Sequence, residues 1–250
     1  MPVKLDQIIN RKEFDAVLFD LDGVLTPTAT VHSACWKQMF DEFLSHCSNE
    51  QNIKLKPFDR TSDYLNYVDG KPRYEGVKSF LDSRDIELHY GDPADDPGME
   101  SMCALGNRKE VLVNTMLAEQ GVEPYPSSVI VVEKLLLAGF KTGVVSSSKN
   151  CQAVLKAARI EDLFDVCVDG KVATQRGLPG KPAPDTFLEA ALELSIPVKR
   201  AVVVEDAISG VQAGAAGGFG LVIGIARHGD SEDLERHGAD IVVSDLEELL

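Results

Sequence analysis

The chain has 250 residues, of which 44% are hydrophobic and 26% are charged, and its formal net charge is -15. These proportions are ordinary for a globular protein, and the length suits one large domain or a core that carries an insert. The acidic excess argues against nucleic acid and against an anionic membrane surface as partners. An anionic substrate would therefore need a local pocket of lysine, arginine, metal and backbone N–H groups.

The cysteines and the first residues indicate the cellular compartment in which the protein is expected. The five cysteines are scattered and form no CxxC pair, which favours a reducing, cytoplasmic compartment and no zinc site. Residues 1–11 contain no long apolar core, and no run approaches the ~18 apolar residues that a membrane span needs. We therefore expect a cytoplasmic protein with no signal peptide and no membrane segment. We also expect it to be a monomer.

One stretch near the beginning organises the chain. Ala16 to Phe19 is short, apolar and rich in strand formers, so it is predicted to be a buried strand. Asp20, Asp22 and Gly23 follow where the chain leaves the sheet. Two carboxylates there repel each other unless a cation is shared, although Asp22-Gly23 could also be a simple turn.

From Tyr125 onward, strands and helices alternate, which indicates a doubly wound parallel α/β sheet of the Rossmann-like kind. Between the first strand and this alternation lies a polar segment of helices and loops. We therefore expect a discontinuous α/β core, residues 1–29 and 122–250, with an inserted helical cap domain, residues 30–121. The later strands are expected at Lys141–Val145, Phe164–Val168, Ala201–Val204, Gly220–Ile225 and Ile241–Val243, and helices at Ala34–Leu44, Val111–Gln120, Ser127–Ala138, from Asn150 to about Arg159, Ala183–Leu194 (with Pro184 in its first turn), Gly210–Ala216 and Glu232–Arg236.

Polar groups fall at the carboxyl ends of several predicted strands or in the next loop. They are Asp20 and Asp22, Ser146, Lys181, and the pair Glu205 and Asp206. Because parallel strands end at one edge of the sheet, these groups can converge there. The carboxylates suit Mg²⁺, while a lysine, a serine hydroxyl and backbone N–H groups suit a phosphoryl group. One aspartate can attack phosphorus and a second can move a proton.

Each group also has an ordinary explanation when it is taken alone. Ser146 could cap a helix, Lys181 could be an exposed surface lysine, and Glu205-Asp206 could be a solvated acidic turn. All of them in this order, each at a strand end or in the following loop, favour the functional interpretation.

The order DxDGVLT, VVSSSKN, GKPAPD and VVVEDA resembles the four motifs of the haloacid dehalogenase superfamily, and it spans nearly the whole core. The resemblance implies that Asp20 is the nucleophile, that Asp22 is the general acid/base, and that Ser146 and Lys181 assist. It also implies Mg²⁺ bound by Asp20, Glu205, Asp206 and the backbone carbonyl of Asp22. The presence of Asp22 argues against the dehalogenase branch, which lacks this acid and the metal.

The insert resembles the helical cap of the β-phosphoglucomutase subgroup. That resemblance implies a catalytic role for His32 and a cap-loop grip on the distal phosphate by Gly70 and Arg73. The further substrate-binding residues that it implies are Thr28, Lys109, Ser147, Ser148, Lys149 and Asn150. His32 and Arg73 could also be structural or solvated residues, Trp36 is expected to serve packing, and Lys109 is equally open.

The resemblance leads to the expectation of a phosphosugar mutase that converts β-D-glucose 1-phosphate into glucose 6-phosphate. Asp20 would form an aspartyl phosphate, and glucose 1,6-bisphosphate would be both intermediate and activator. The partner would be a small phosphorylated sugar. The alternatives are a Mg²⁺-dependent sugar-phosphate phosphatase of the same superfamily and, from another class, a non-catalytic sugar-phosphate binder.

Overall fold

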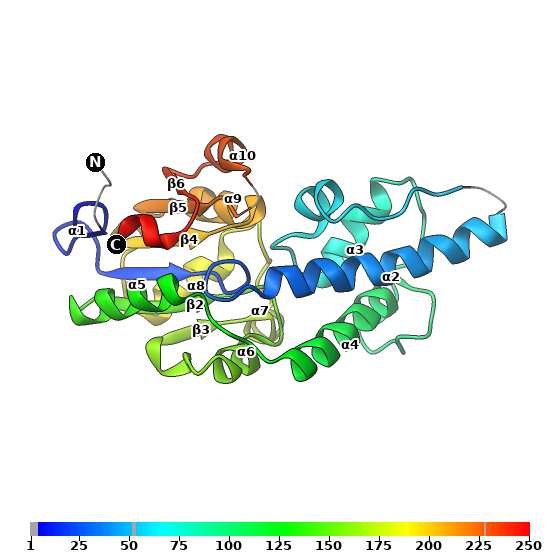
Figure 1. The fold of residues 1–250 in the computed structure, drawn as a ribbon, viewed down its shortest axis with the longest axis horizontal. Coiled ribbons are helices and arrows are strands. Elements are labelled where there is room, and N and C mark those ends of the chain that lie inside the picture. Colours follow the sequence, from blue (N-terminus) through cyan, green and yellow to red (C-terminus); the bar gives the residue numbers. More distant parts are fainter. Residues whose placement is uncertain (1–4, 52–53, 228) are drawn as a thin grey trace. The chain divides into compact units, whose positions relative to one another are not determined.

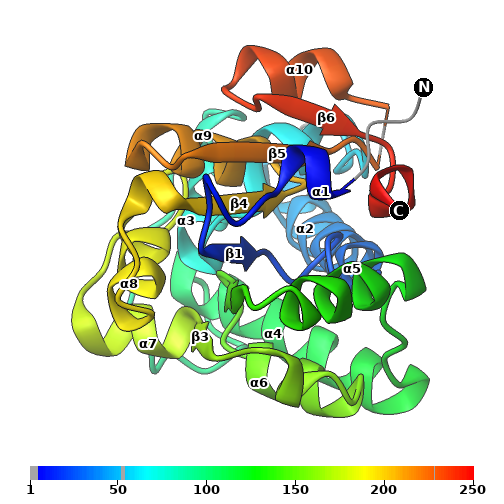
Figure 2. The ribbon, with the colours of Figure 1, turned by 90° about the vertical axis from the view of Figure 1, so that its left-hand side faces the viewer.

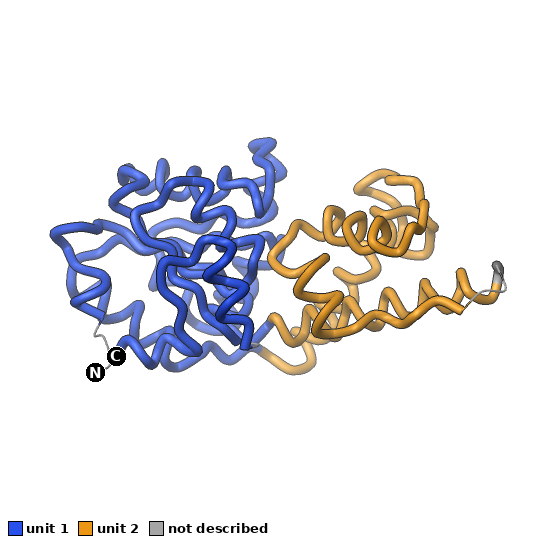
Figure 3. Tube along the Cα trace, turned by 90° about the horizontal axis from the view of Figure 1, so that it is seen from above, with its two compact units in different colours: residues 1–28, 122–250 blue, residues 29–121 orange. Residues whose placement is uncertain are grey.

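The computed structural model describes residues 5–51, 54–227 and 229–250, which form two compact units (Figure 3). Unit 1 comprises residues 1–28 and 122–250, apart from those outside the described ranges, and unit 2 comprises residues 29–121 with the same restriction. No described helix combines the length and the apolar character that crossing a membrane requires.

A six-stranded parallel sheet forms the centre of unit 1, with the strand order β3-β2-β1-β4-β5-β6 (Figures 1 and 2). The Rossmann-like α/β fold expected from the sequence is confirmed. The strands are β1 (Ala16–Phe19), β2 (Lys141–Val145), β3 (Val166–Val168), β4 (Ala201–Glu205), β5 (Leu221–Ile225) and β6 (Ile241–Val243).

Helices cover both faces of this sheet. Alternate residues of each strand point to opposite faces, so apolar side chains on both faces need helices to bury them. Leu18 and Val203 belong to a buried cluster with residues of α8 (Asp185–Glu193) and α9 (Ile208–Gly217). Figure 2 shows these two helices on one side of the sheet and α5 (Pro126–Leu137) on the other. With both faces covered, a central strand can be apolar throughout, as the residues of β1 are.

The remaining helical segments of unit 1 are short. They are α1 (Leu5–Ile8), α6 (Cys151–Ala157), η2 (Glu161–Leu163), α7 (Gly170–Arg176), η3 (Val198–Arg200), α10 (Ser231–Arg236) and η4 (Leu246–Leu249). Helix α7 is missing from the sequence-based assignment although its signals are present. Asp169 caps its first turn through bonds from two backbone N–H groups, and Gly177 ends it in the left-handed conformation.

Several predicted helix limits are wrong by a few residues. The helix expected at Ala34–Leu44 runs over Thr28–Gln51 as α2, because Pro27 precedes a stretch without helix breakers. The helix expected at Val111–Gln120 begins earlier, at Met102, after Ser101 accepts a bond from the N–H of Ala104. Pro184 lies at the N-cap of α8 and not in its first turn, and α6 ends at Ala157.

Unit 2 is helical and consists of α2, η1 (Tyr64–Val68), α3 (Arg73–Asp82) and α4 (Met102–Gln120), together with their connections. Its core is an aromatic cluster. Phe40 stacks on Trp36 with ring centroids 5.3 Å apart, and it lies 4.1 Å from Phe80. Phe58 lies against both phenylalanines. Trp36 therefore serves packing, and it is the only tryptophan of the chain.

Replacing Phe80 with alanine should destabilise unit 2 by about 3–5 kcal/mol, because it leaves a cavity among buried rings. Urea unfolding followed by Trp36 fluorescence measures the effect within this cluster. Leu192→Ala is the control, since Leu192 is 70% exposed and should change stability by less than about 0.5 kcal/mol. Equal midpoints for both variants would contradict this description of the core.

Candidate active site

The sheet register brings three polar strand ends to the same level. Phe19 of β1 is paired with Val144 of β2 on one side and with Val204 of β4 on the other. Asp20, at the end of β1, therefore lies between the ends of its two neighbours, from which Ser146 and Glu205 emerge.

Lys181 joins these strand ends through a buried ammonium group. Its Nζ forms an ion pair with Asp20, lies 2.5 Å from Oε1 of Glu205, and donates a hydrogen bond to the Val145 carbonyl at 3.0 Å. The Lys181 side chain is only 1% exposed, and its ammonium lies 5.0 Å from the centroid of the Phe187 ring. Burial alone would lower the pKa of Lys181, but the charges of Asp20 and Glu205 raise it above its ordinary value. This lysine is a fixed positive charge and not the exposed surface lysine of the alternative interpretation.

Three buried carboxylates share this positive charge. Asp20, Glu205 and Asp206 each place a carboxylate oxygen within 4.8 Å of the others. Burial, together with the charges of Glu205 and Asp22, raises the pKa of Asp20 well above its usual range, against the opposing effect of Lys181. One lysine does not balance three carboxylates, and hard oxygen ligands are those that Mg²⁺ prefers. The donor set therefore fits a magnesium ion.

The position of Glu205 depends on the start of α9. Its Oε2 accepts hydrogen bonds from the N–H groups of Asp206 and Ala207, at 3.1 and 3.2 Å. A Cβ atom at Gly210 would lie 1.9 Å from the Glu205 carboxyl carbon. The absence of a side chain at Gly210 thus makes room for the carboxylate that meets Lys181.

Asp22 has surroundings that differ from those of Asp20. Leu21 between them is fully buried, and the Thr28 hydroxyl donates a hydrogen bond to Oδ1 of Asp22. The hydroxyls of Thr26 and Thr28 are 2.7 Å apart. Thr28 was expected to bind substrate; within unit 1, the structure places its hydroxyl on the candidate acid/base.

The turn after Asp22 contacts the metal-ligand candidates directly. Gly23 has a φ of +88°, which a glycine adopts without strain. A Cβ atom there would lie 1.7 Å from Oδ2 of Asp206. Gly23 is therefore required twice, for the backbone conformation and for the approach of Asp206.

The loop that follows β2 is folded back on itself by its own serines. The Ser146 Oγ accepts a hydrogen bond from the N–H of Ser148 at 3.1 Å, and the Ser148 Oγ accepts one from Asn150 at 3.2 Å. An accepting hydroxyl keeps its own hydrogen. Ser146, which is 2% exposed, can therefore still donate to a phosphoryl oxygen.

The first residue of α7 packs against the backbone of this loop. The N–H of Gly170 donates to the Ser148 carbonyl at 3.1 Å. A Cβ atom at Gly170 would lie 2.6 Å from the Ser147 carbonyl oxygen and 3.1 Å from the backbone nitrogen of Lys149. The backbone of the predicted phosphate loop is therefore closely packed against a second strand end.

Within unit 2, His32 and Lys109 meet. The Nζ of Lys109 lies 2.6 Å from Nδ1 of His32 and 4.9 Å from the centroid of the Trp36 ring system. A lysine ammonium can only donate, so Nδ1 of His32 accepts and the proton of a neutral ring sits on Nε2. Lys109 is only 4% exposed, which makes it a positioned residue and not a solvated one.

Arg73 has other partners in the same unit. Its Nη1 lies 3.1 Å from Oε2 of Glu110, and its Nη2 donates to Asn107 and to the Tyr74 hydroxyl, each at 3.0 Å. Arg73 begins α3, shortly after Gly70, whose φ is +67°. The guanidinium therefore joins α3 to α4, and a carboxylate occupies the place where an anionic group would bind.

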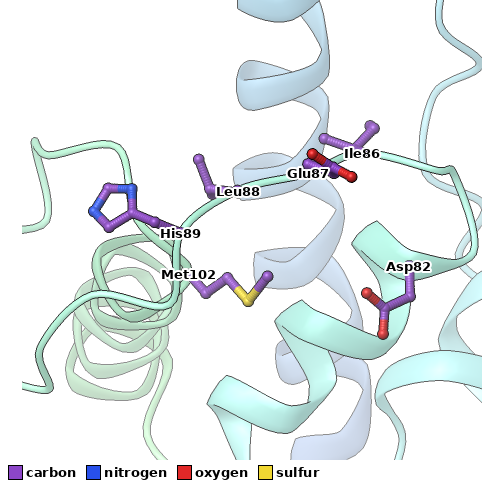
Figure 4. Close-up of a pocket in the computed structure, with 6 residues that line it drawn as sticks. All are labelled: Asp82, Ile86, Glu87, Leu88, His89 and Met102. Atoms are coloured by element: carbon purple, nitrogen blue, oxygen red, sulfur yellow. The ribbon is translucent and has the colours of Figure 1, made fainter.

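An open surface pocket lies elsewhere in unit 2, along the segment after α3 (Figure 4). Asp82 and Glu87 line it together with Ile86, Leu88, His89 and Met102. Asp82 pairs with Lys78 at 2.5 Å, Glu87 adds a second carboxylate, and the described lining residues include no lysine or arginine, so this pocket does not fit the predicted substrate.

Some contributors to the site carried no usable signal in the sequence. Phe187 and Gly210 act through contacts that arise only when α8 and α9 pack on the sheet. Glu110 stands next to Lys109 in the sequence, but an acidic residue in a helix is unremarkable by itself. The pairing of Thr28 with Asp22 could have been suspected from the run of threonines after the DxDG motif.

Comparison with known proteins identifies the family. The model of the haloacid dehalogenase-like hydrolase family matches residues 14–218. A beta-phosphoglucomutase from Mycobacterium tuberculosis is 46% identical over 239 residues, which cover 94% of this chain and 91% of the relative. A beta-phosphoglucomutase from Bacillus subtilis is 30% identical over 94% of this chain and 91% of its own length.

The fold agrees with these matches. The crystal structure of a beta-phosphoglucomutase from Clostridium difficile superposes with a TM-score of 0.73, covering 95% of this chain and 93% of that chain at 22% identity. The superfamily and the subgroup that the motifs predict are confirmed by these findings. The chain belongs to the haloacid dehalogenase-like hydrolase family and is an enzyme of that family, similar to its beta-phosphoglucomutases.

Proposed function

We propose that the chain is a phosphosugar mutase that converts β-D-glucose 1-phosphate into glucose 6-phosphate. The observation that carries the proposal is the buried Asp20, paired with Lys181 inside an acidic cluster, in a chain that is 46% identical to a beta-phosphoglucomutase. In this proposal the small phosphorylated sugar is the substrate, and glucose 1,6-bisphosphate is both intermediate and activator.

Asp20 would act as the nucleophile. A carboxylate oxygen of Asp20 attacks phosphorus, the bond between phosphorus and the sugar oxygen breaks, and that oxygen takes a proton from Asp22. In the reverse sense, Asp22 accepts the proton of the sugar hydroxyl that attacks the aspartyl phosphate. Lys181 and the hydroxyl of Ser146 would hold the phosphoryl oxygens, assisted by the backbone of Ser147 and Ser148 and by the side chains of Lys149 and Asn150.

Mg²⁺ is the cofactor that fits this site. Asp20, Glu205 and Asp206 would hold it together with the backbone carbonyl of Asp22. When bound, the ion supplies positive charge that offsets the negative charge of the phosphoryl oxygens.

The residues of unit 2 would act as a cap that binds the sugar end of the substrate. His32, held by Lys109 with its ring proton on Nε2, would hydrogen-bond toward the sugar or toward the acid/base. Arg73 would exchange Glu110 for the distal phosphate, next to the loop at Gly70. Exclusion of water would protect the aspartyl phosphate from hydrolysis.

One observation favours the phosphatase alternative. Arg73 already has a carboxylate partner in Glu110, and an arginine kept by this partner could not grip a second phosphate. The protein would then transfer the phosphoryl group to water.

We expect a monomer in the cytoplasm, where the five free thiols would persist.

Mixing the protein with Mg²⁺, β-glucose 1-phosphate and a trace of glucose 1,6-bisphosphate separates these candidates. We expect glucose 6-phosphate, measured with a coupled dehydrogenase. Arg73→Ala should lower this rate by about 100-fold or more, since a charged hydrogen bond to phosphate contributes about 1.5–3 kcal/mol and orientation adds to it. Release of inorganic phosphate without isomerisation would instead identify a phosphatase.

Arg84→Ala is the matched control for Arg73→Ala. Arg84 is similarly buried in unit 2, pairs with Asp63 at 2.6 Å and lies over the Phe80 ring. Its loss should cost comparable stability and leave the mutase rate within about threefold. Equal loss of rate in both variants would attribute the effect of Arg73 to folding alone.

Gly23→Ala should weaken Mg²⁺ binding at least about tenfold, because the new Cβ would displace Asp206 and the backbone would be strained. Calorimetric Mg²⁺ titration and the Mg²⁺ dependence of the rate both measure this effect. Gly177→Ala is the control: it has a φ of +65° but no atom within 4 Å of the added Cβ. An unchanged Mg²⁺ affinity in Gly23→Ala would remove Asp206 from the set of ligands.

A further inference from the structure

Three successive backbone carbonyls of the turn that follows Asp22 accept hydrogen bonds from distant parts of the sequence. The Gly23 carbonyl accepts a hydrogen bond from Nε of Arg227 at 2.8 Å. The Val24 carbonyl accepts one from the Ser128 hydroxyl at 2.6 Å, and the Leu25 carbonyl accepts one from the N–H of Tyr125 at 2.9 Å. All three donors lie more than 95 positions away in the sequence but belong to the same unit.

Arg227 is itself fixed by several neighbours. It follows β5, and its Nη1 pairs with Asp245 and donates to the Ser244 carbonyl at 3.5 Å. Its guanidinium carbon lies 4.0 Å from the centroid of the Tyr125 ring. A planar guanidinium can stack and donate from two nitrogens at the same time, which a lysine cannot do. The Arg227 side chain is 14% exposed.

The Asp245 carboxylate is the charged partner of Arg227 in this network. Burial by itself would raise the pKa of Asp245, but hydrogen bonds from Ser127 and Arg227 lower it below its usual value. Nε and Nη1 of Arg227 donate to backbone carbonyls and to Asp245, whereas its buried Nη2 has no hydrogen-bond partner among the described residues.

The conformation of the turn sets the direction of Asp22. Gly23 donates its N–H to the Thr26 carbonyl at 2.7 Å, and its Cα packs against Asp206 with no room for a side chain. The Gly23 carbonyl belongs to the peptide that joins Gly23 to Val24, so the loss of its partner would free the ψ angle of Gly23, one peptide unit away from Asp22. Thr28 orients the carboxylate of Asp22. The backbone of the turn that follows Asp22 is held by the donors on Arg227, Ser128 and Tyr125.

We propose that Arg227 is a positioning residue that aims Asp22 at the oxygen of the leaving sugar by holding the Gly23 carbonyl, with Ser128 as the lesser second support. This inference rests on the proposed function, in which Asp22 is the general acid/base. It assigns no contact between Arg227 and substrate.

Leaving groups of different basicity test this role. A sugar alkoxide leaves phosphorus only when it is protonated, whereas the acetate of acetyl phosphate leaves without a proton. Phosphorylation of Asp20 is measured in single turnovers by rapid quench and intact-protein mass spectrometry, with Mg²⁺ and either glucose 1,6-bisphosphate or acetyl phosphate as donor. In both cases an Asp20 oxygen replaces the leaving oxygen on phosphorus.

Arg227→Met should slow transfer from the bisphosphate by about 10- to 100-fold, a part of the 10²–10⁴-fold that a general acid contributes. Transfer from acetyl phosphate should fall by less than about threefold. Ser128→Ala should show the same selectivity with a smaller loss, and it keeps the question answerable if Arg227→Met does not fold. Arg236→Met is the control, because Arg236 is 68% exposed and pairs only locally with Asp233; both of its rates should stay unchanged.

Asp22→Asn distinguishes the two possible failures. If Asp22→Asn slows both donors alike, then Asp22 is not the acid and the proposed function itself is wrong. If Asp22→Asn is selective but Arg227→Met and Ser128→Ala slow both donors equally, or slow neither, then the turn does not aim Asp22 and the positioning role is overturned.

Discussion

The buried ammonium of Lys181 is the interaction on which the site depends. Three carboxylates at 0–6% exposure could not remain ionised side by side without positive charge, because burial and mutual repulsion both favour protonation. Lys181 touches two of them and reaches the Val145 carbonyl, so it also joins three neighbouring strands. Removing one member of such a cluster would leave its partners buried and unpaired. The cluster is therefore a constraint on the fold as well as the centre of the candidate active site.

The parallel sheet explains why these residues meet. β1 lies between β2 and β4, and the register places the three strand ends level with one another. Residues 20, 146 and 205 are far apart in the sequence, yet each lies at the end of a strand or directly after it, at the same edge of the sheet. Small residues complete the arrangement, since Gly23 and Gly210 leave space for Asp206 and Glu205. The arrangement of the carboxylates thus depends on the two glycines, which have no side chain, as well as on the charged residues.

The sequence predicted this edge well for a physical reason. Buried parallel strands are short apolar runs with clear ends, so β1, β2 and β6 lie where they were expected, and the polar residues after the strands could be assigned to one edge. Helix limits in the insert were predicted less well, because α2 and α4 carry polar residues on most sides and depend on tertiary packing. Glu110 as the partner of Arg73, and Arg227 as the partner of Gly23, depend on packing between distant segments, which no local pattern records.

Two aspartates separated by one residue can have different roles because their neighbours differ. Asp20 lies beside the Lys181 ammonium and two buried carboxylates. These surroundings suit a carboxylate that would act as a nucleophile next to a bound cation. Asp22 faces the neutral hydroxyl of Thr28, which can orient a carboxylate in either protonation state. Leu21, which lies between them in the sequence, is fully buried. In the proposed function Asp20 is the nucleophile and Asp22 the proton carrier. The turn at Gly23, supported by Arg227, Ser128 and Tyr125, would then set the angle between these two groups.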